Sequence, residues 1–237
     1  MIYKNNIVLM NKKVITFLIL GLLVFSACGK KTKIHSGTAQ ELYSDATNEL
    51  YNNKGGFPWV FTGPDYDLIL ETLREIQLRY TFSPFATLAE IRTADTYFRQ
   101  EEYIQAITEY DNFIKNHPGH NEVEYAMYQL ALSNYKLKGG KDRDPTYARE
   151  AVKWFTIFKE NYPNSELYPG ADKRILKCND ILAEREIFIG KYYMRKKNYR
   201  AAEARFNLVL QNFPETKYTE EAYKLISKLP AEKTPES

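Results

Sequence analysis

One stretch decides the fold of this 237-residue chain: YIQAITEYDNFIKNHP, residues 103–118. Counted from Tyr103, apolar residues follow at i+3, i+4, i+7 and i+10, a spacing that places them on one face of a helix. Pro118 closes the unit, because proline has no backbone N–H to donate and its ring clashes with the preceding turn. The stretch therefore predicts an amphipathic helix with a defined end.

The same pattern occurs 37 residues earlier, and again 45 and 96 residues later; only Glu203 and Thr81 depart from it. In the aligned segments, a small residue at the i+3 position, such as Ala106, lets two helices cross closely. A large residue at the i+7 position, such as Tyr110, fills the space between hairpins. This order is typical of the tetratricopeptide repeat, although the spacings of 37, 45 and 51 residues exceed the nominal ~34. We predict an all-α, tetratricopeptide-like solenoid of about four to five irregular hairpins. The aligned columns are Ile69, Leu73 and Ile76; Ala106, Tyr110 and Phe113; Ala151, Phe155 and Phe158; and Ala202, Phe206 and Val209.

Apolar residues at helical spacing also occur between these segments and predict the partner helix of each hairpin. One partner, residues 165–197, is long enough to account for the 51-residue spacing. The repeat domain is predicted to span residues 39–227. A polar tail, residues 228–237, follows it and is expected to be disordered.

Two segments do not fit the repeat. Residues 52–65 form an aromatic insertion in the first hairpin, which either packs back over that hairpin or serves as an exposed contact. In the second segment, residues 139–145, we predict that Asp144 caps a helix whose first residue is Pro145.

The N-terminal residues have the layout of a secretory signal peptide, with Lys12 and Lys13 ahead of an uncharged run, residues 14–24, that is apolar except for Thr16. The eleven residues of this run span only about 16 Å as a helix, roughly half of the hydrocarbon core of a membrane. The run therefore predicts a signal peptide, residues 1–27, rather than a transmembrane helix. Met10 is an alternative initiator, since it begins a more compact charged start.

Small residues directly before Cys28 are similar to the bacterial lipobox, in which the cysteine is acylated and becomes the first residue of the mature chain. We predict a covalent lipid on Cys28 and a lipidated linker over residues 28–38. The alternative is an ordinary signal peptide with an incidental cysteine, which the abrupt change to a lysine-rich sequence at residues 29–33 disfavours. Phe25 is a departure, because leucine is usual at that position.

The net charge of the chain comes from its predicted signal peptide. The formal charge of +3 equals that of Lys4, Lys12 and Lys13, because residues 1–27 contain no Asp or Glu. The mature chain then has 30 basic and 30 acidic side chains (33 basic minus those three, against 30 acidic). Such a balance lacks the positive footprint of a nucleic-acid-binding protein, and we expect no nucleic-acid partner.

Few residues suit catalysis or metal binding. His117 and His120 flank a Pro-Gly turn without further Cys or His ligands nearby. No nucleophile elbow, phosphate-binding loop or dinucleotide motif occurs. Cys178 lies in an apolar-periodic stretch and is expected to be a buried, inert thiol. We therefore expect a non-enzymatic protein with no catalytic residues, no metal site and no cofactor besides the lipid on Cys28.

Tyrosine is unusually frequent, with nineteen residues. Two interpretations remain open for several of them: they line a peptide groove, since tyrosine offers a large contact area at low entropy cost, or they are repeat core with the hydroxyl reaching solvent. The residues concerned are Tyr97, Tyr125, Tyr128, Tyr135, Tyr192 and Tyr193.

The strings between the repeats are more specific than the repeats themselves. They are RYTFSPF at residues 79–85, DRDP at 142–145, YPNS at 162–165 and NFPET at 212–216. On these strings the sequence resembles the BamD family of outer-membrane assembly lipoproteins, from about residue 39 to residue 226. The resemblance implies a scaffold subunit of the machinery that assembles outer-membrane β-barrels, held by its lipid on the periplasmic face of the outer membrane. The implied partners are the POTRA domains of a BamA-like barrel insertase and unfolded outer-membrane proteins.

The resemblance also implies roles for individual residues. Three residues near the first hairpins would border a pocket for unfolded precursors: Phe82, Phe85 and Tyr97. Three others would face the insertase: Arg205, Arg143 and Asp144.

Departures from the family concern these same surfaces. Thr81 stands where a proline is usual, residues 52–65 replace a tight turn, and the fifth hairpin lacks its second helix. A second function therefore remains open from the sequence, that of a periplasmic repeat lipoprotein that organises cell-wall or division enzymes.

Overall fold

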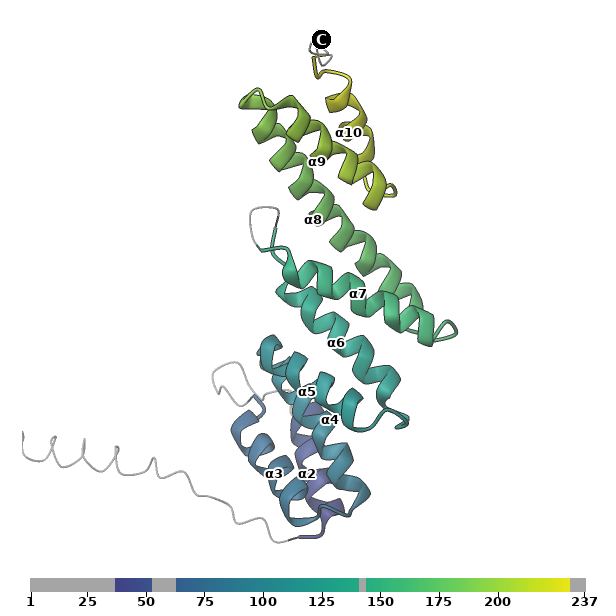
Figure 1. The fold of residues 1–237 in the computed structure, drawn as a ribbon. Helices are drawn as coiled ribbons and strands as arrows, with labels where there is room; N and C mark the ends of the chain where they lie inside the picture. The colour runs from purple at the N-terminus through teal and green to yellow at the C-terminus, as the bar shows by residue number, and fades with distance from the viewer. Residues whose placement is uncertain (1–36, 53–62, 141–143, 231–237) are drawn as a thin grey trace, which may run out of the picture. The chain divides into compact units, whose positions relative to one another are not determined.

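A computed structural model describes residues 37–52, 63–140 and 144–230, all within one unit that starts at Gly37. In these ranges the chain forms nine helices and no strand, which confirms the predicted all-α fold (Figure 1). None of these helices combines the length and the apolar character that crossing a membrane requires. The helices are α2 (Ala39–Asn52), α3 (Tyr66–Arg79), α4 (Pro84–Arg99), α5 (Tyr103–Asn116), α6 (Val123–Leu137), α7 (Thr146–Asn161), α8 (Tyr168–Arg195), α9 (Tyr199–Asn212) and α10 (Thr219–Ile226).

Each helix packs mainly on the next one in the chain, and Figure 1 shows them following one another from α2 to α10. The pairs α2–α3, α4–α5, α6–α7 and α8–α9 form four hairpins, and α10 packs on α9. In addition α2 contacts α4, and α6 contacts α8, so first helices of successive hairpins are neighbours. The predicted tetratricopeptide-like solenoid is confirmed.

The columns aligned in the sequence are the most deeply buried positions of α3, α5, α7 and α9. Every residue in the three regular columns has at most 1% of its surface exposed. The position directly after Ala106 or Ala151 differs from these columns, because Ile107 and Val152 are only half-buried. Glu203 occupies this position in α9 and is exposed, so the irregularity in the sequence falls where burial is not required.

The longest helix, α8, belongs to two hydrophobic clusters. It has 28 residues and is therefore about 42 Å long. The part of α8 up to Leu182 contributes Cys178 and Leu182 to a cluster with α6 and α7, and the part from Ala183 onward contributes Ala183 and Ile187 to a cluster with α9 and α10. Burial raises the pKa of the Cys178 thiol to about 11, which keeps it protonated and unreactive.

Helices α8 and α9 cross closely at Gly190. A Cβ atom on this residue would lie 2.3 Å from Cε1 and 2.8 Å from Cδ1 of Phe206, far inside van der Waals contact. Phe206 is fully buried, so its ring cannot swing into solvent. The absence of a side chain at residue 190 therefore sets the spacing between the two helices.

The start of α7 is one residue later than predicted. The helix begins at Thr146, and Pro145 takes the N-cap position that was expected for Asp144. The Asp144 carboxylate accepts hydrogen bonds from the Thr146 backbone N–H at 3.0 Å and from its hydroxyl at 2.8 Å. A bond to the backbone two residues on is an Asx turn, so the predicted side-chain bond exists but precedes the cap.

Several sequence predictions lie outside the described residues. They concern the signal peptide, Cys28 and most of its linker, Arg143, most of the insertion at residues 52–65, and the tail beyond residue 230.

Candidate functional site

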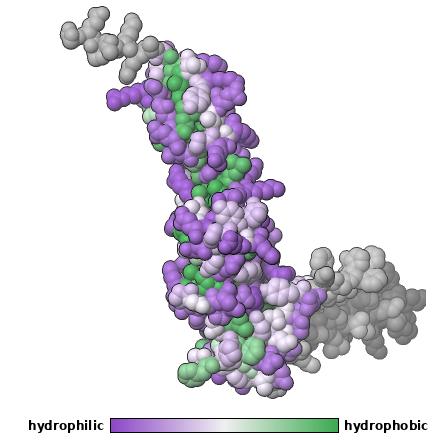
Figure 2. Space-filling model, turned by 90° about the vertical axis from the view of Figure 1, so that its right-hand side faces the viewer, coloured by the Kyte–Doolittle hydropathy of each residue, from purple (hydrophilic) through white to green (hydrophobic). Residues whose placement is uncertain are grey.

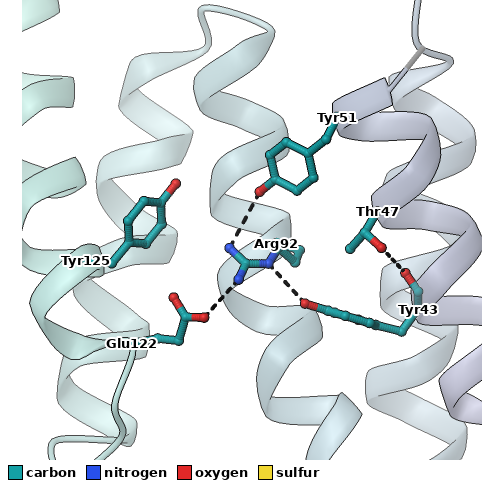
Figure 3. A pocket seen from close by; sticks show the side chains of 6 residues that line it. All are labelled: Tyr43, Thr47, Tyr51, Arg92, Glu122 and Tyr125. Atoms are coloured by element: carbon teal, nitrogen blue, oxygen red, sulfur yellow. Dashed lines mark hydrogen bonds and ion pairs between the residues drawn. The ribbon is translucent and has the colours of Figure 1, made fainter.

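A pocket opens between the first helices of three successive hairpins, α2, α4 and α6 (Figure 3). Its volume is about 390 Å³, and polar aromatic side chains dominate its walls, so we call it the tyrosine pocket. The residues that line it are Tyr43, Thr47, Tyr51, Arg92, Glu122 and Tyr125.

Helical spacing explains how the sequence places these side chains together. Tyr43, Thr47 and Tyr51 recur every four residues and therefore share one face of α2. Glu122 directly precedes α6, and its backbone N–H donates to Nδ1 of His120 at 3.1 Å. This bond fixes the turn that points Glu122 towards the pocket.

A buried carboxylate, Asp95, lies behind the pocket and ties four helices together. Its Oδ2 accepts from the Tyr51 hydroxyl at 2.5 Å and from Nη1 of Arg92 at 2.6 Å. Its Oδ1 accepts from the hydroxyls of Tyr110 at 2.6 Å and Tyr125 at 2.8 Å. Four donors satisfy the four lone-pair positions of a carboxylate, which is what burial of this charge demands.

The same burial fixes the protonation of the groups around Asp95. Burial, reinforced by the charge of Asp95, raises the pKa of Tyr51, Tyr110 and Tyr125 above the ordinary value for tyrosine. Burial by itself would lower the pKa of Arg92, but the charges of Asp95 and Tyr51 and the hydrogen bonds to Tyr43 and Asp95 together outweigh burial, and the pKa is raised. Near neutral pH the three tyrosines are therefore neutral donors and the arginine is charged.

Arg92 uses its remaining donors within the pocket. Its Nε donates to the Tyr43 hydroxyl at 3.0 Å, and its Nη2 donates to Oε1 of Glu122 at 3.0 Å (Figure 3). Within the described part of the chain, the Tyr43 hydroxyl accepts this bond and donates none, so its O–H can donate to a ligand. Oε2 of Glu122 likewise accepts no bond from another described residue and can accept one from a ligand. The pocket thus offers one donor, one acceptor and aromatic walls, which is a binding arrangement.

The residues predicted to bind precursors lie at separate places on the first two hairpins. Phe82 is fully exposed at the turn before α4, whereas Phe85 packs on the α2–α3 cluster, with its ring centroid 5.5 Å from that of Tyr43. Tyr97 packs on the next cluster. It lies twelve residues after Phe85 on the same helix, a distance of about 18 Å. Of the three, Phe85 is next to the tyrosine pocket.

Of the three residues predicted to face the insertase, the structure describes two, Arg205 and Asp144. Nη1 of Arg205 lies 3.0 Å from Oε2 of Glu186 on α8, and the two side chains are 38% and 11% exposed. Arg205 is thus a partly buried ion-pair member on the α8–α9 hairpin. Asp144 is exposed before α7.

Of the six tyrosines considered as groove residues, Tyr125 lines the tyrosine pocket. Tyr128 instead packs in the core, with ring contacts to two phenylalanines of α7. Sequence reasoning missed Tyr43, Arg92 and Asp95. The available signal was an acidic residue, Asp95, among the apolar positions of α4, where burial requires several donors.

Comparisons with known proteins find relatives of this chain over most of its length. Residues 36–234 match the family model YfiO, described as outer membrane lipoprotein. The chain is 26% identical to outer membrane protein assembly factor BamD of Neisseria meningitidis serogroup B, across 91% of this chain and 82% of that protein. It is 23% identical to BamD of Pasteurella multocida, across 90% and 82%, and 30% identical to BamD of Rickettsia prowazekii, across 68% and 64%.

Proposed function

We propose that this chain, which belongs to the YfiO family of outer membrane lipoproteins, is a non-enzymatic scaffold in the assembly of outer-membrane β-barrel proteins. Its relatives are named as assembly factors for outer membrane proteins. In this proposal a lipid on Cys28 anchors the chain to the outer membrane, and the repeats face the periplasm. The helical repeats hold two partners, an unfolded precursor and the POTRA domains of a BamA-like insertase.

The tyrosine pocket carries the proposal for the precursor. An extended peptide presents backbone C=O and N–H groups, which match the free donor of Tyr43 and the free acceptor of Glu122. The aromatic walls suit an apolar side chain of the same peptide. Phe85, in contact with Tyr43, extends this surface, so the pocket is the place where we expect a barrel segment ending in an aromatic residue.

A conservative substitution tests this site. Tyr43→Phe keeps the ring and removes the hydroxyl, and it should weaken binding of a barrel C-terminal peptide about five- to tenfold, since a hydrogen bond contributes roughly 1 kcal/mol. Tyr223→Phe on α10 is the matched control and should leave the affinity unchanged. Equal affinities of wild type and Tyr43→Phe, or equal binding of a scrambled peptide, would remove the pocket from the proposal.

Arg205 carries the proposal for the insertase. Its guanidinium is partly desolvated beside Glu186, and a further acidic group from a partner would complete its surroundings. Truncating one member of a desolvated charge pair typically costs about 2–5 kcal/mol of binding. Arg205→Ala should therefore weaken POTRA binding roughly thirtyfold or more, with helicity intact. Arg200→Ala, on the exposed side of the same helix, is the control. The proposal also assigns Arg143 and Asp144 to insertase binding.

Partner identification distinguishes this function from its alternative. The native lipoprotein is isolated from membranes with its bound proteins, which are identified by mass spectrometry. Recovery of a barrel protein with POTRA domains supports the proposal. Recovery of cell-wall or division enzymes without such a barrel would refute it.

A further inference from the structure

The turn between α3 and α4 presents apolar side chains to solvent. Phe82 is fully exposed and Leu78, in the last turn of α3, is 69% exposed. Isolated exposed apolar residues are common on protein surfaces. Two large ones around a single turn are less usual, and Figure 2 shows hydrophobic surface at the lower end of the described unit, where Figure 1 shows α3 ending and α4 beginning.

This turn is ordered rather than loose. The Ser83 N–H donates to the Tyr80 carbonyl at 2.8 Å, which closes a turn with Phe82 at its tip. The Thr81 hydroxyl donates back to the Leu78 carbonyl at 3.3 Å, and Oγ of Ser83 accepts the N–H of Phe85 at 3.2 Å. The backbone therefore holds the exposed phenylalanine outward in a fixed position.

The turn is also tied to the point where the chain arrives from its predicted anchor. The Tyr80 hydroxyl donates to the Gly37 carbonyl at 2.6 Å. Eight residues lie between Cys28 and Gly37 in the sequence, and the nine residue steps that join the two reach at most about 30 Å. A lipid on Cys28 would therefore keep Gly37 within about 30 Å of the membrane surface, and the turn is held beside Gly37 by the Tyr80 hydrogen bond.

We propose that Phe82 and Leu78 dip into the lipid surface beside the anchor and form a second membrane contact. The inference rests on the lipid at Cys28, which is part of the proposed function. A lipid on a linker by itself leaves the repeats free to rotate, whereas a second contact at the α3–α4 turn orients the first hairpin on the membrane. Apolar side chains at an ordered surface site gain from burial at the headgroup boundary.

Site-directed labelling of the full-length lipoprotein tests the contact. An acylated Cys28 has no free thiol and Cys178 is buried, so an introduced cysteine is the reactive one. Phe82→Cys carries an environment-sensitive fluorophore. Two controls use exposed apolar positions elsewhere, Ile104→Cys on α5 (58% exposed) and Tyr223→Cys on α10 (62% exposed). The proteins are placed in vesicles of phosphatidylethanolamine and phosphatidylglycerol.

The expected result is a blue shift at position 82 and loss of its quenching by iodide, with neither change at the two controls. A label at position 82 that stays water-exposed on an acylated protein would overturn the membrane contact and leave the anchor intact. An unmodified Cys28 in the mass spectrum of the same sample would refute the anchor, and this inference with it. A shift at position 82 caused by a barrel C-terminal peptide without vesicles would assign Phe82 to precursor binding instead.

Discussion

Replacing Gly190 by alanine tests the close crossing of α8 and α9. The added Cβ atom would meet the Phe206 ring at 2.3 Å, so the ring or the helix must move by about 1 Å to reach an ordinary contact. Phe206 lies in the cluster formed by α8, α9 and α10 and has no exposed surface into which it can move. The substitution therefore overpacks the core.

Two effects of opposite sign determine how much Gly190→Ala changes the free energy of unfolding. Overpacking costs about 1–3 kcal/mol, and alanine in place of glycine within a helix returns about 0.5–1 kcal/mol. The two ranges leave a net loss of about 0–2.5 kcal/mol with a midpoint near 1 kcal/mol, and a loss of about 1 kcal/mol lowers the melting temperature by about 2–4 °C for a domain of this size. Thermal unfolding followed by circular dichroism at 222 nm measures it.

A double-mutant cycle isolates the contact itself. In a Phe206→Leu background the alanine has room, so Gly190→Ala should be neutral or stabilising, and the coupling should be at least about 1 kcal/mol. Gly170→Ala on the same helix is the matched control, because its Cβ would meet only the ends of the long side chains Arg174 and Tyr128. A higher melting temperature for Gly190→Ala in the wild-type background would contradict the close crossing.

Three further predictions address the core, the buried tyrosines and the anchor. Ala151→Leu should cost about 1–3 kcal/mol by overpacking the corresponding crossing of α7; unchanged thermal unfolding would show that the repeat alignment is wrong. Burial raises the pKa of Tyr51, Tyr110 and Tyr125, so these tyrosines ionise at lower pH in the unfolded chain than in the folded one. The free energy of unfolding should therefore be independent of these groups up to about pH 10 and decrease at higher pH. Urea unfolding at rising pH measures this decrease, which should be smaller in Tyr125→Phe. Mass spectrometry of the mature N-terminus should find acyl chains on Cys28, and an intact signal segment would exclude them.

The fold was predictable because burial in α3, α5, α7 and α9 follows a regular spacing. Ala151 and Phe155 are fully buried at the positions that the alignment assigned, since a helix that packs on both sides leaves little freedom in residue type there. The start of α7 was misplaced by one residue because Asp144 and Pro145 suit both a cap and the Asx turn before it. The short sequence Asp144-Pro145 by itself does not distinguish an N-cap from an Asx turn that precedes the cap.

The tyrosine pocket was not predictable from the sequence. Tyr43, Arg92 and Glu122 come from three hairpins, and each by itself reads as an ordinary polar residue on a helix surface. Their function arises from the side-by-side packing of first helices, which depends on the crossing angles of the hairpins rather than on any local pattern. The Asp95 network that orients them likewise joins residues up to 44 positions apart.

The length of α8 has a mechanical consequence. The hydrophobic cluster shared with α6 and α7 ends at Leu182, and the cluster shared with α9 and α10 begins at Ala183, so no unpacked segment separates them. A load applied to α9 by a bound partner therefore travels along one hydrogen-bonded rod of about 42 Å into the third hairpin. A loop at this place would absorb such a load, whereas the continuous helix transmits it as torque. In hydrogen exchange, the amides on either side of Leu182 should consequently open in separate steps when the last hairpin detaches, with the N-terminal half of α8 remaining protected.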